Sequence, residues 1–400
     1  MMNDTMRNAK GDVRGKRRIG VALNVVLAWC VAASLADEPD GSRPTAATAH
    51  KAGGMDPALV SLAQPPTPPA VAVKVTELRA NPHFKYADAP LTAVKRDDSY
   101  DWYHFIGELA GVGATTEMVK MGGSLDQPAQ TVLLKKSKHG FIDMQGFTGA
   151  VWIQSMSKFP NDELLGVCHV EWVFVKDGKA QGRVGLAYSK NNGDSWTYLG
   201  HVVSTYNDWF GYNECISGGP HIVKDGWLYL YFNESADMGP TWKQLPLSVA
   251  RARLDDVLTN ARNGKVTPFK KFNNGRWADD GIGGHSTPIF RPGKESNDVG
   301  IGWHMTYNKY LKQYVFAYCA GTDTKLTFSR DGLAWSEPST IFKGRKKFAY
   351  YVSIVSNGEF PQETDRSFNV YTMDMENTSN YSIERVEVTL TAEPERTSAR

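Results

Sequence analysis

Acidic residues beside aromatic or histidine residues are the groups in this sequence best suited to catalysis. Glu171 ends the run His169-Val-Glu171, and strand alternation would turn both ionisable side chains to the same face. Such neighbours can shift each other's pKa, as catalytic acids and bases often do. Asp98 and Asp101 precede Trp102, and a ring beside acids suits a sugar, because its C–H faces stack while its hydroxyls bond to carboxylates. The structural alternatives are a salt bridge for Glu171 and turn formation for the two aspartates.

Two further acidic residues stand in polar and aromatic surroundings. Glu214 occurs in Tyr212-Asn-Glu214-Cys just before a strand-like run, and Asp208 occurs in Asn207-Asp208-Trp209. Cleavage of a glycosidic bond needs two carboxyl groups, one protonated and one ionised. If the chain performs it, Glu171 and Glu214 together with Asp98 or Asp101 are the predicted catalytic residues. The alternative for Glu214 is a solvated loop carboxylate.

Four histidines come from separate strand-like segments of the sequence. They are His169, His221, His285 and His304, and with Trp102 and Asp208 they form the predicted substrate-binding set. A single histidine is more often structural, but several on strands that converge could share ligation or hydroxyl contacts. The sequence has no Cys/His spacing typical of zinc and no dense Asp/Asn loop typical of calcium.

Two similar short stretches indicate the elements that would position these residues. Ser189-Lys-Asn-Asn-Gly-Asp-Ser-Trp196 and Ser329-Arg-Asp-Gly-Leu-Ala-Trp335 each combine Asn or Asp with Gly and end in Trp. Asn, Asp and Gly tolerate the positive φ of tight hairpins. The stretches resemble Asp-boxes, peripheral hairpins of sialidase-type β-propellers, for which we predict a structural role. Widely spaced strand-turn-strand repeats are typical of propellers.

Strand-like runs and turns alternate through the rest of the chain. Lys176-Asp-Gly178 and Lys224-Asp-Gly226 each separate apolar runs, which predicts hairpins, and the only helix expected lies near Leu254–Ala261. A spacing of about 140 residues between the two boxes fits two blades of about 70, as expected for four-stranded blades. The predicted fold is all-β, a five-bladed β-propeller of four-stranded antiparallel blades; a β-sandwich or β-helix is the alternative.

Several longer phrases carry a family resemblance. They are Ser217-Gly-Gly-Pro-His221-Ile-Val-Lys-Asp-Gly-Trp-Leu-Tyr-Leu-Tyr231, Val249-Ala-Arg-Ala-Arg253 and Gly281-Ile-Gly-Gly-His285-Ser-Thr-Pro288. In this order they resemble the five-bladed propeller glycoside hydrolases, a group that includes arabinanases, xylosidases and fructosidases. The resemblance covers roughly residues 98–375. It implies hydrolysis of a glycosidic bond, by inversion, without a required cofactor, and with a possible structural Ca²⁺ on the propeller axis.

The sequence departs from that group at two motifs. Arabinanase-type sequences place Glu directly before Gly-Pro, whereas Gly218 stands there and Glu214 is the nearest carboxylate. The Asp-Pro pair of the opening blade is also missing, and Asp97, Asp98 and Asp101 are the nearest acids. A glycan-binding propeller without activity therefore stays open, as does a uronate lyase that uses His and Tyr. A sialidase-like enzyme is a further alternative, although Arg183, Lys190 and Arg276 are too scattered to predict a three-arginine clamp.

The N-terminal region is typical of export. A basic segment ends at Arg18, an apolar run covers residues 19–35, and small residues precede Asp37, so residues 1–36 are predicted to be a signal peptide. Residues 37–72 are rich in Pro and Ala and predict a disordered linker, residues 73–392 the propeller, and residues 393–400 a polar tail. We expect a secreted or periplasmic monomer that has no membrane segment after cleavage. A net charge of +2 without a basic block gives no support for nucleic-acid binding.

Overall fold

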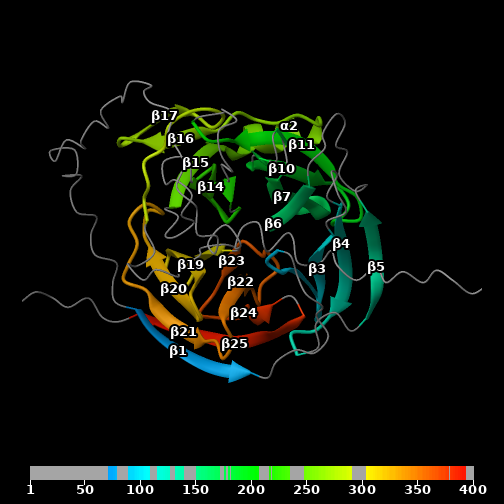
Figure 1. Ribbon diagram of the computed structural model, residues 1–400, viewed down its shortest axis with the longest axis vertical. Coiled ribbons are helices and arrows are strands. Elements are labelled where there is room, and N and C mark those ends of the chain that lie inside the picture. Colours follow the sequence, from blue (N-terminus) through cyan, green and yellow to red (C-terminus); the bar gives the residue numbers. More distant parts are fainter. Residues whose placement is uncertain are drawn as a thin grey trace, which may run out of the picture.

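The structure, a computed structural model, consists of five small sheets arranged around one axis as a five-bladed β-propeller (Figure 1). The residues that it describes are 71–78, 89–108, 115–126, 131–138, 150–171, 175–176, 179–180, 182–206, 216–217, 219–234, 247–290, 303–377 and 379–392. The predicted signal peptide and C-terminal tail lie outside these residues, as does the linker apart from its last two residues. No helix among the described residues is long and apolar enough to cross a membrane.

Blades 1 and 2 each contain four antiparallel strands. Blade 1 is formed, from the axis outward, by β2 (Thr92–Arg96), β3 (Ser99–Glu108), β4 (Thr115–Gly123) and β5 (Thr131–Lys138). Blade 2 is formed by β6 (Ala150–Phe159), β7 (Glu163–Glu171), β10 (Arg183–Ser189) and β11 (Thr197–Val203). A 3₁₀ turn, Pro160–Asp162, joins β6 to β7, and the short pair β8 (Val175–Lys176) and β9 (Lys179–Ala180) lies between β7 and β10 in the chain.

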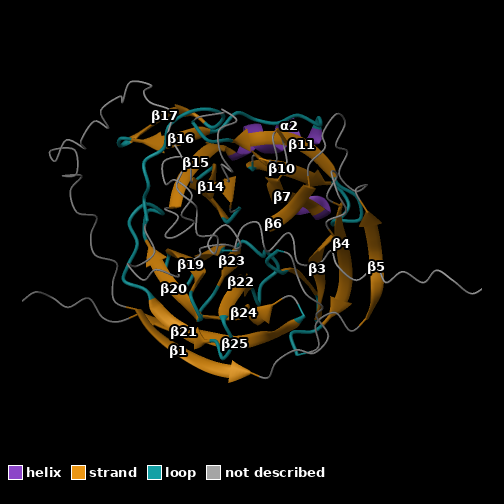
Figure 2. Cartoon of the chain, viewed as in Figure 1, coloured by secondary structure: helices purple, strands orange, loops and turns teal. Residues whose placement is uncertain are grey.

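Blade 3 is the largest and carries the helix of the described chain. Its first strand is split into β12 (Ile216–Ser217) and β13 (His221–Lys224), which both pair with β14 (Trp227–Glu234). Then follow β15 (Leu247–Arg253), β16 (Lys270–Asn273) and β17 (Arg276–Asp280). Helix α2 (Leu254–Arg262), purple in Figure 2, follows β15, where the sequence predicts a helix. It buries Val257, Leu258 and Ala261.

Blades 4 and 5 complete the circle. Blade 4 contains β18 (His304–Asn308), β19 (Gln313–Ala320), β20 (Asp323–Ser329) and β21 (Ser339–Lys343), and β23 (Glu363–Thr364) pairs with β18. Blade 5 contains β22 (Phe348–Val355), β24 (Ser367–Asn377), β25 (Asn380–Ala392) and, as its outermost strand, β1 (Val71–Leu78). The N-terminal strand of the propeller thus pairs with its C-terminal strand, so the circle is closed by hydrogen bonds between the two ends of the domain.

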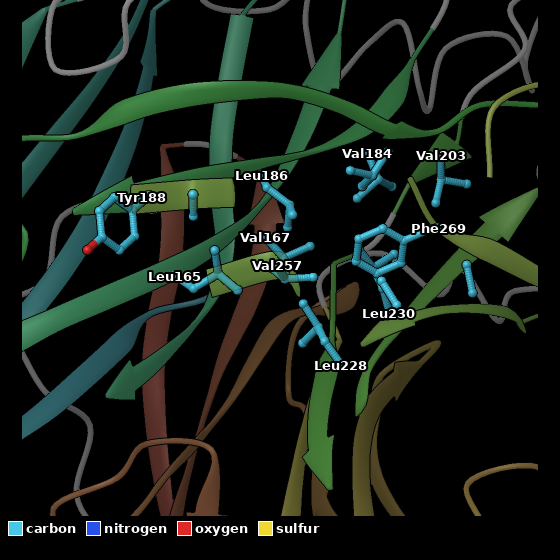
Figure 3. Packing of buried hydrophobic residues seen from close by; sticks show 14 of the residues in the cluster. Leu165, Val167, Val184, Leu186, Tyr188, Val203, Leu228, Leu230, Val257 and Phe269 are labelled. Carbon is cyan, nitrogen blue, oxygen red and sulfur yellow. The ribbon is translucent and has the colours of Figure 1, made fainter. Parts of the chain in front are cut away.

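Apolar residues on both faces of the blades form the core. β10 is buried along its whole length, because its sheet is covered by blade 1 on one face and blade 3 on the other. A cluster that includes Val167, Leu186, Leu230 and Phe269 fills the space between blades 2 and 3, and α2 adds to it (Figure 3). Burial on both faces explains why these strands read as continuous apolar runs without strict alternation.

Strand direction gives the propeller two different ends. The first strand of every blade runs the same way, and each following strand of the blade runs back. We call one end of the propeller the entry end: there the first strand of each blade begins and the second strand finishes. We call the other end the turn end, because the turns from first to second strand and from third to fourth strand lie there.

The two similar stretches form matching turns between the third and fourth strands of blades 2 and 4. In each, a serine Oγ accepts the glycine N–H at 2.8 Å, from Gly193 to Ser189 and from Gly332 to Ser329. The spacing of two blades predicted from the sequence is therefore confirmed. Gly193 has a φ of 76°, and a Cβ there would lie 2.5 Å from the ring of Tyr103 in blade 1. The turn fits closely against the preceding blade, which agrees with the predicted structural role.

Candidate functional site

The first strands of the described blades carry no Asp or Glu. The polar positions of these strands, which are β2, β6, β12, β13, β18 and β22, carry hydroxyl, amide, imidazole, lysine and arginine side chains. An acid pair near the axis must therefore come from other strands or from the connections between them.

A segment of blade 5 covers the axis at the turn end. Gln362 exchanges two hydrogen bonds with the backbone of Lys158 in blade 2, at 3.0 and 2.9 Å, and its carbonyl accepts the N–H of Tyr307 in blade 4 at 3.0 Å. In the same segment the carbonyl of Asn357 accepts a hydrogen bond from Lys95 of blade 1 at 2.9 Å. One connection thus ties four blades together across this end, so the entry end is the better place for a ligand.

Asp98 and Asp101 lie at the turn end. Asp98 is exposed in the turn between β2 and β3. Asp101 is buried, and its Oδ2 accepts a hydrogen bond from Asn192 at 2.6 Å and lies 3.0 Å from Arg96 Nε and 3.6 Å from Lys120 Nζ. Asp101 therefore joins blade 1 to the turn of blade 2, in place of the catalytic role predicted for it. Asp98 takes the turn position named as its alternative.

Trp102 lies in the core, in contrast to the predicted contact with substrate. Its side chain is fully buried and packs edge-to-face on Tyr371 of blade 5, with ring centroids 5.4 Å apart. A sugar could reach this ring only if the interface between blades 1 and 5 opened. The aromatic residue beside the acids is thus a packing residue, and alternation along β3 turns it away from the side that meets blade 2.

Two glutamates end the second strands of neighbouring blades at the entry end. Glu171 ends β7 opposite Ala150, which begins the first strand of blade 2. Glu234 ends β14 opposite Ile216, which begins the first strand of blade 3. The two residues therefore occupy corresponding positions in adjacent blades. Glu234 was missed in the sequence, although a signal was present: the hairpin at Asp225-Gly226 is followed by one apolar strand that ends in a carboxylate.

Glu234 is held in place by donors from several segments. Its Oε1 accepts the backbone N–H of Tyr206 at 2.9 Å, and its Oε2 accepts the Ser286 hydroxyl at 2.6 Å and lies 3.5 Å from Lys271 Nζ. Lys271 is fully buried, and its ammonium also donates to the carbonyls of Ser204 and Gly284 at 2.7 and 2.6 Å. A carboxylate with this many fixed contacts is well oriented, which a catalytic or hydroxyl-binding group requires.

An aromatic pair adjoins Glu234. The ring of Tyr206 stacks on His285, with centroids 4.5 Å apart and planes 21° apart. His285 is exposed and Tyr206 half-buried. The backbone of Tyr206 and Ser286, the neighbour of His285, are the groups that hold Glu234. The predicted substrate-binding histidine therefore lies beside a carboxylate that the sequence reasoning did not select.

His221 is fixed between two serines of the neighbouring first strand. Ser155 donates its proton to the Gly219 carbonyl, so its Oγ accepts from His221 Nδ1 at 2.6 Å, and the Ser157 hydroxyl then donates to Nε2 at 2.5 Å. Burial, with a smaller contribution from His304, lowers the pKa of His221 to about 3. The ring is neutral at ordinary pH, and its two nitrogens are already used.

His304 begins β18 in blade 4 and is also buried. Burial lowers the pKa of His304 to about 4, and its Nδ1 makes no hydrogen bond to the part of the chain that the structure describes. His169, in β7, stacks on Trp152 of the adjacent first strand at 5.9 Å. His169 lies two residues before Glu171 in the same strand. Of the predicted histidines, His169 thus shares a strand with Glu171, and His285 precedes Ser286, which contacts Glu234.

Two predicted residues lie outside the described part of the chain, and the described part offers no metal site. Glu214 and Asp208 lie outside the described residues; Glu214 is two residues before Ile216 in the sequence. The described residues contain no group of three or more His, Cys, Asp or Glu that could hold a metal. Ca²⁺ prefers carboxylate and carbonyl oxygens, and the imidazoles His221 and His304 near the axis do not fit it.

The three basic residues considered for a sialic-acid clamp lie apart. Arg183 begins β10 at the entry end, Lys190 is exposed in the turn of blade 2 at the turn end, and Arg276 is exposed on β17, the outermost strand of blade 3. They cannot bind one carboxylate together.

Comparison with known proteins supports the fold. No protein-family model matches the chain, and no curated protein matches it. A solved structure described as a glycoside hydrolase has 12% identity and a TM-score of 0.50, over 84% of this chain and 94% of its own. An α-L-arabinofuranosidase from Podospora anserina, solved with cellotriose, has 9% identity and a TM-score of 0.48, over 80% and 95%. A family 117 glycoside hydrolase from Zobellia galactanivorans has 12% identity and a TM-score of 0.46, over 79% of this chain and 90% of its own. At identities of 9–12% the likeness concerns the fold alone.

Proposed function

We propose that this protein is a glycoside hydrolase that cleaves an oligo- or polysaccharide at the entry end of the propeller. The observation that carries the proposal is the pair of corresponding positions of Glu171 and Glu234, at the ends of second strands in adjacent blades. Cleavage of a glycosidic bond requires two carboxyl groups on either side of the bond. Solved glycoside hydrolases of the same fold give the proposal its reaction class by analogy.

The surroundings of the two acids suggest different roles. Glu234 lies next to the Lys271 ammonium and accepts two hydrogen bonds, which suits the ionised partner that activates water. Glu171 is the proposed proton donor, and Glu214 is the alternative donor, because it stands two residues before the strand that pairs with Glu234. The exposed His285, which is stacked on the half-buried Tyr206 beside Glu234, would bind the face of a sugar ring.

The state of the buried histidines disfavours the lyase alternative. A base that removes a proton next to a uronate carboxyl works best with a pKa near the operating pH. The pKa values of His221 and His304 are lowered to about 3 and about 4, far below that range. These imidazoles are suited to act as neutral hydrogen-bonding groups.

The test is a screen of the purified protein against plant, algal and bacterial glycans. Hydrolysis is detected as new reducing ends, and elimination as an increase in ultraviolet absorbance. On a substrate found in this way, Glu171→Gln and Glu234→Gln should each reduce kcat at least about 100-fold. Glu171→Gln should leave thermal unfolding unchanged, whereas Glu234→Gln should also lower the unfolding temperature, because it leaves the buried Lys271 without its carboxylate, so kcat of that variant is measured well below its own unfolding temperature. Glu359→Gln is the matched control, because Glu359 is an exposed carboxylate at the turn end, paired with Lys158. Full activity of both catalytic variants would refute the assignment, and an ultraviolet-absorbing product would favour elimination.

Two finer predictions accompany the proposal. Inversion predicts that the first product detected by NMR has the opposite anomeric configuration, and a separation of roughly 6.5–9.5 Å between the two carboxyl groups. Export predicts that N-terminal sequencing of the protein from a periplasmic or culture fraction begins near Asp37. Glycan binding measured by calorimetry without any product would support the non-catalytic alternative.

A further inference from the structure

A guanidinium group on the side of blade 3 is stacked between two indole rings. The Arg251 guanidinium carbon lies 4.1 Å from the ring centroid of Trp227 and 4.2 Å from that of Trp277. Arg253, two residues further along β15, lies on the same face of the strand, 4.9 Å from the Trp227 centroid. Strand pairing explains the arrangement, because Trp227 is the partner of Arg253 in the adjacent β14. We call these four residues the arginine–tryptophan patch.

The patch is partly open to solvent and distant from the entry end. Arg253 is exposed, whereas Arg251 and the two tryptophans are half-buried. Trp227 begins β14 and Arg253 ends β15, so both lie next to the turn at Gly226, at the turn end of the blade. The proposed catalytic carboxylates end their strands at the opposite end. A ligand on the patch would therefore occupy a second site.

No described residue neutralises the two guanidinium groups. Arg251 Nε is buried and has no hydrogen-bond partner, and neither arginine lies within 4.0 Å of a described carboxylate oxygen. The nearby exposed Asp225 is instead 3.9 Å from Lys224. In the part of the chain that the structure describes, the contacts of Arg251 and Arg253 are thus with indole rings, which orient a guanidinium without using its N–H groups.

A lysine at the contact between blades 1 and 2 shows, for comparison, how a cation is neutralised in this fold. There Lys120 is buried, and its ammonium lies 2.8 Å from Asp194 Oδ1, 3.6 Å from Asp101 Oδ2 and 2.7 Å from the Asn192 carbonyl. The Lys120 ammonium thus holds two blades together, and its three N–H donors face protein oxygens, so none is left for a ligand. The guanidinium groups of the arginine–tryptophan patch keep N–H donors for a ligand, although stacking on indole rings already orients them.

We propose that the arginine–tryptophan patch is a second glycan-binding site that recognises the carboxylate of a uronic acid in an acidic polysaccharide. A guanidinium presents a rigid pair of N–H donors that matches a planar carboxylate, and one already ordered by stacking loses less entropy on binding. The indole edges beside it offer apolar surface to the sugar ring. The choice of a glycan as ligand rests on the proposed function; the preference for a carboxylate comes from the two unneutralised arginines.

The test is isothermal titration calorimetry of the full mature chain with a trimer of galacturonate. The methyl ester of the same trimer is the neutral control, and a sulfated neutral trimer tests whether charge alone suffices. We expect the galacturonate trimer to bind, and the ester to bind at least about ten-fold more weakly, since a hydrogen bond to a charged group is worth at least a factor of that size. Arg251→Gln and Arg253→Gln should each weaken binding of the acid by a similar factor. Arg276→Gln, on the exposed outer strand of the same blade, should leave it unchanged.

The outcomes separate this inference from the proposed activity. Equal affinity for acid and ester, equal affinity of Arg251→Gln and the unchanged protein, or preference for the sulfated trimer would each overturn it. Hydrolysis at the entry end can fail while the trimer still binds in an arginine-dependent way, which leaves the patch supported. Thermal unfolding of each variant shows whether a loss of binding reflects a loss of fold; if Arg251→Gln unfolds, the exposed Arg253 still decides the outcome.

Discussion

The buried histidines predict that this propeller loses stability as the pH falls from 7 to 5. The pKa of His221 is lowered to about 3 and that of His304 to about 4, from 6.5, mainly by burial. The unfolded chain therefore takes up a proton at each histidine below pH 6.5, while the folded protein does not. Stability contributed by a lowered pKa is present above pH 6.5 and is lost as the pH falls towards 3.

The magnitude follows from the two pKa values. At pH 5 the unfolded state is favoured by protonation of each histidine by about 2 kcal/mol, so the two together reduce the free energy of unfolding by about 4 kcal/mol relative to pH 7. Urea unfolding followed by tryptophan fluorescence at pH 7, 6 and 5 measures this loss. The variant His221→Asn should remove about half of the pH dependence, and His304→Asn the other half.

The histidine variants are needed because carboxylates also change the free energy of unfolding at low pH, so the loss in the unchanged protein alone does not identify its source. An identical loss between pH 7 and 5 in the protein and in the double variant would refute the reasoning, since it would mean that the two imidazoles titrate equally in both states. A smaller loss in the double variant would support it, even if the absolute stability of that variant is lower.

Three further changes test the interior. Lys271→Met should cost about 3–5 kcal/mol in urea unfolding, because it leaves Glu234 buried without its ammonium; a cost below about 1 kcal/mol would show that the pair is dispensable. Gly193→Ala should cost about 2–4 kcal/mol, whereas Gly264→Ala should cost only about 1 kcal/mol: both glycines have a positive φ, but only Gly193 meets a tyrosine ring of the preceding blade. Equal costs would argue against that contact. Deletion of β1 should expose the edge of β25 and cause association in light scattering, and a monomeric deletion variant would contradict this.

The fold was largely predictable from local sequence signals. The two matching turns depend on hydrogen bonds between residues two to four positions apart, such as the N–H of Gly193 to Ser189, so their sequence reports their structure directly. Their spacing then gave the number of blades, because each turn sits at the same place in its blade. The site was predicted less well. Glu171 lies at the entry end as a candidate should, whereas Asp101 and Trp102 serve the contacts between blades.

The sequence by itself determined the turns, the strands, the helix and hence a five-bladed propeller, since these follow from neighbours along the chain. Only the tertiary structure decided which end of the propeller each acid occupies and what neutralises it. Asp101 meets Asn192, 91 positions away, and Glu234 meets Ser286, 52 positions away. Such contacts arise when separate blades close around one axis, and no local pattern specifies which side chains then meet.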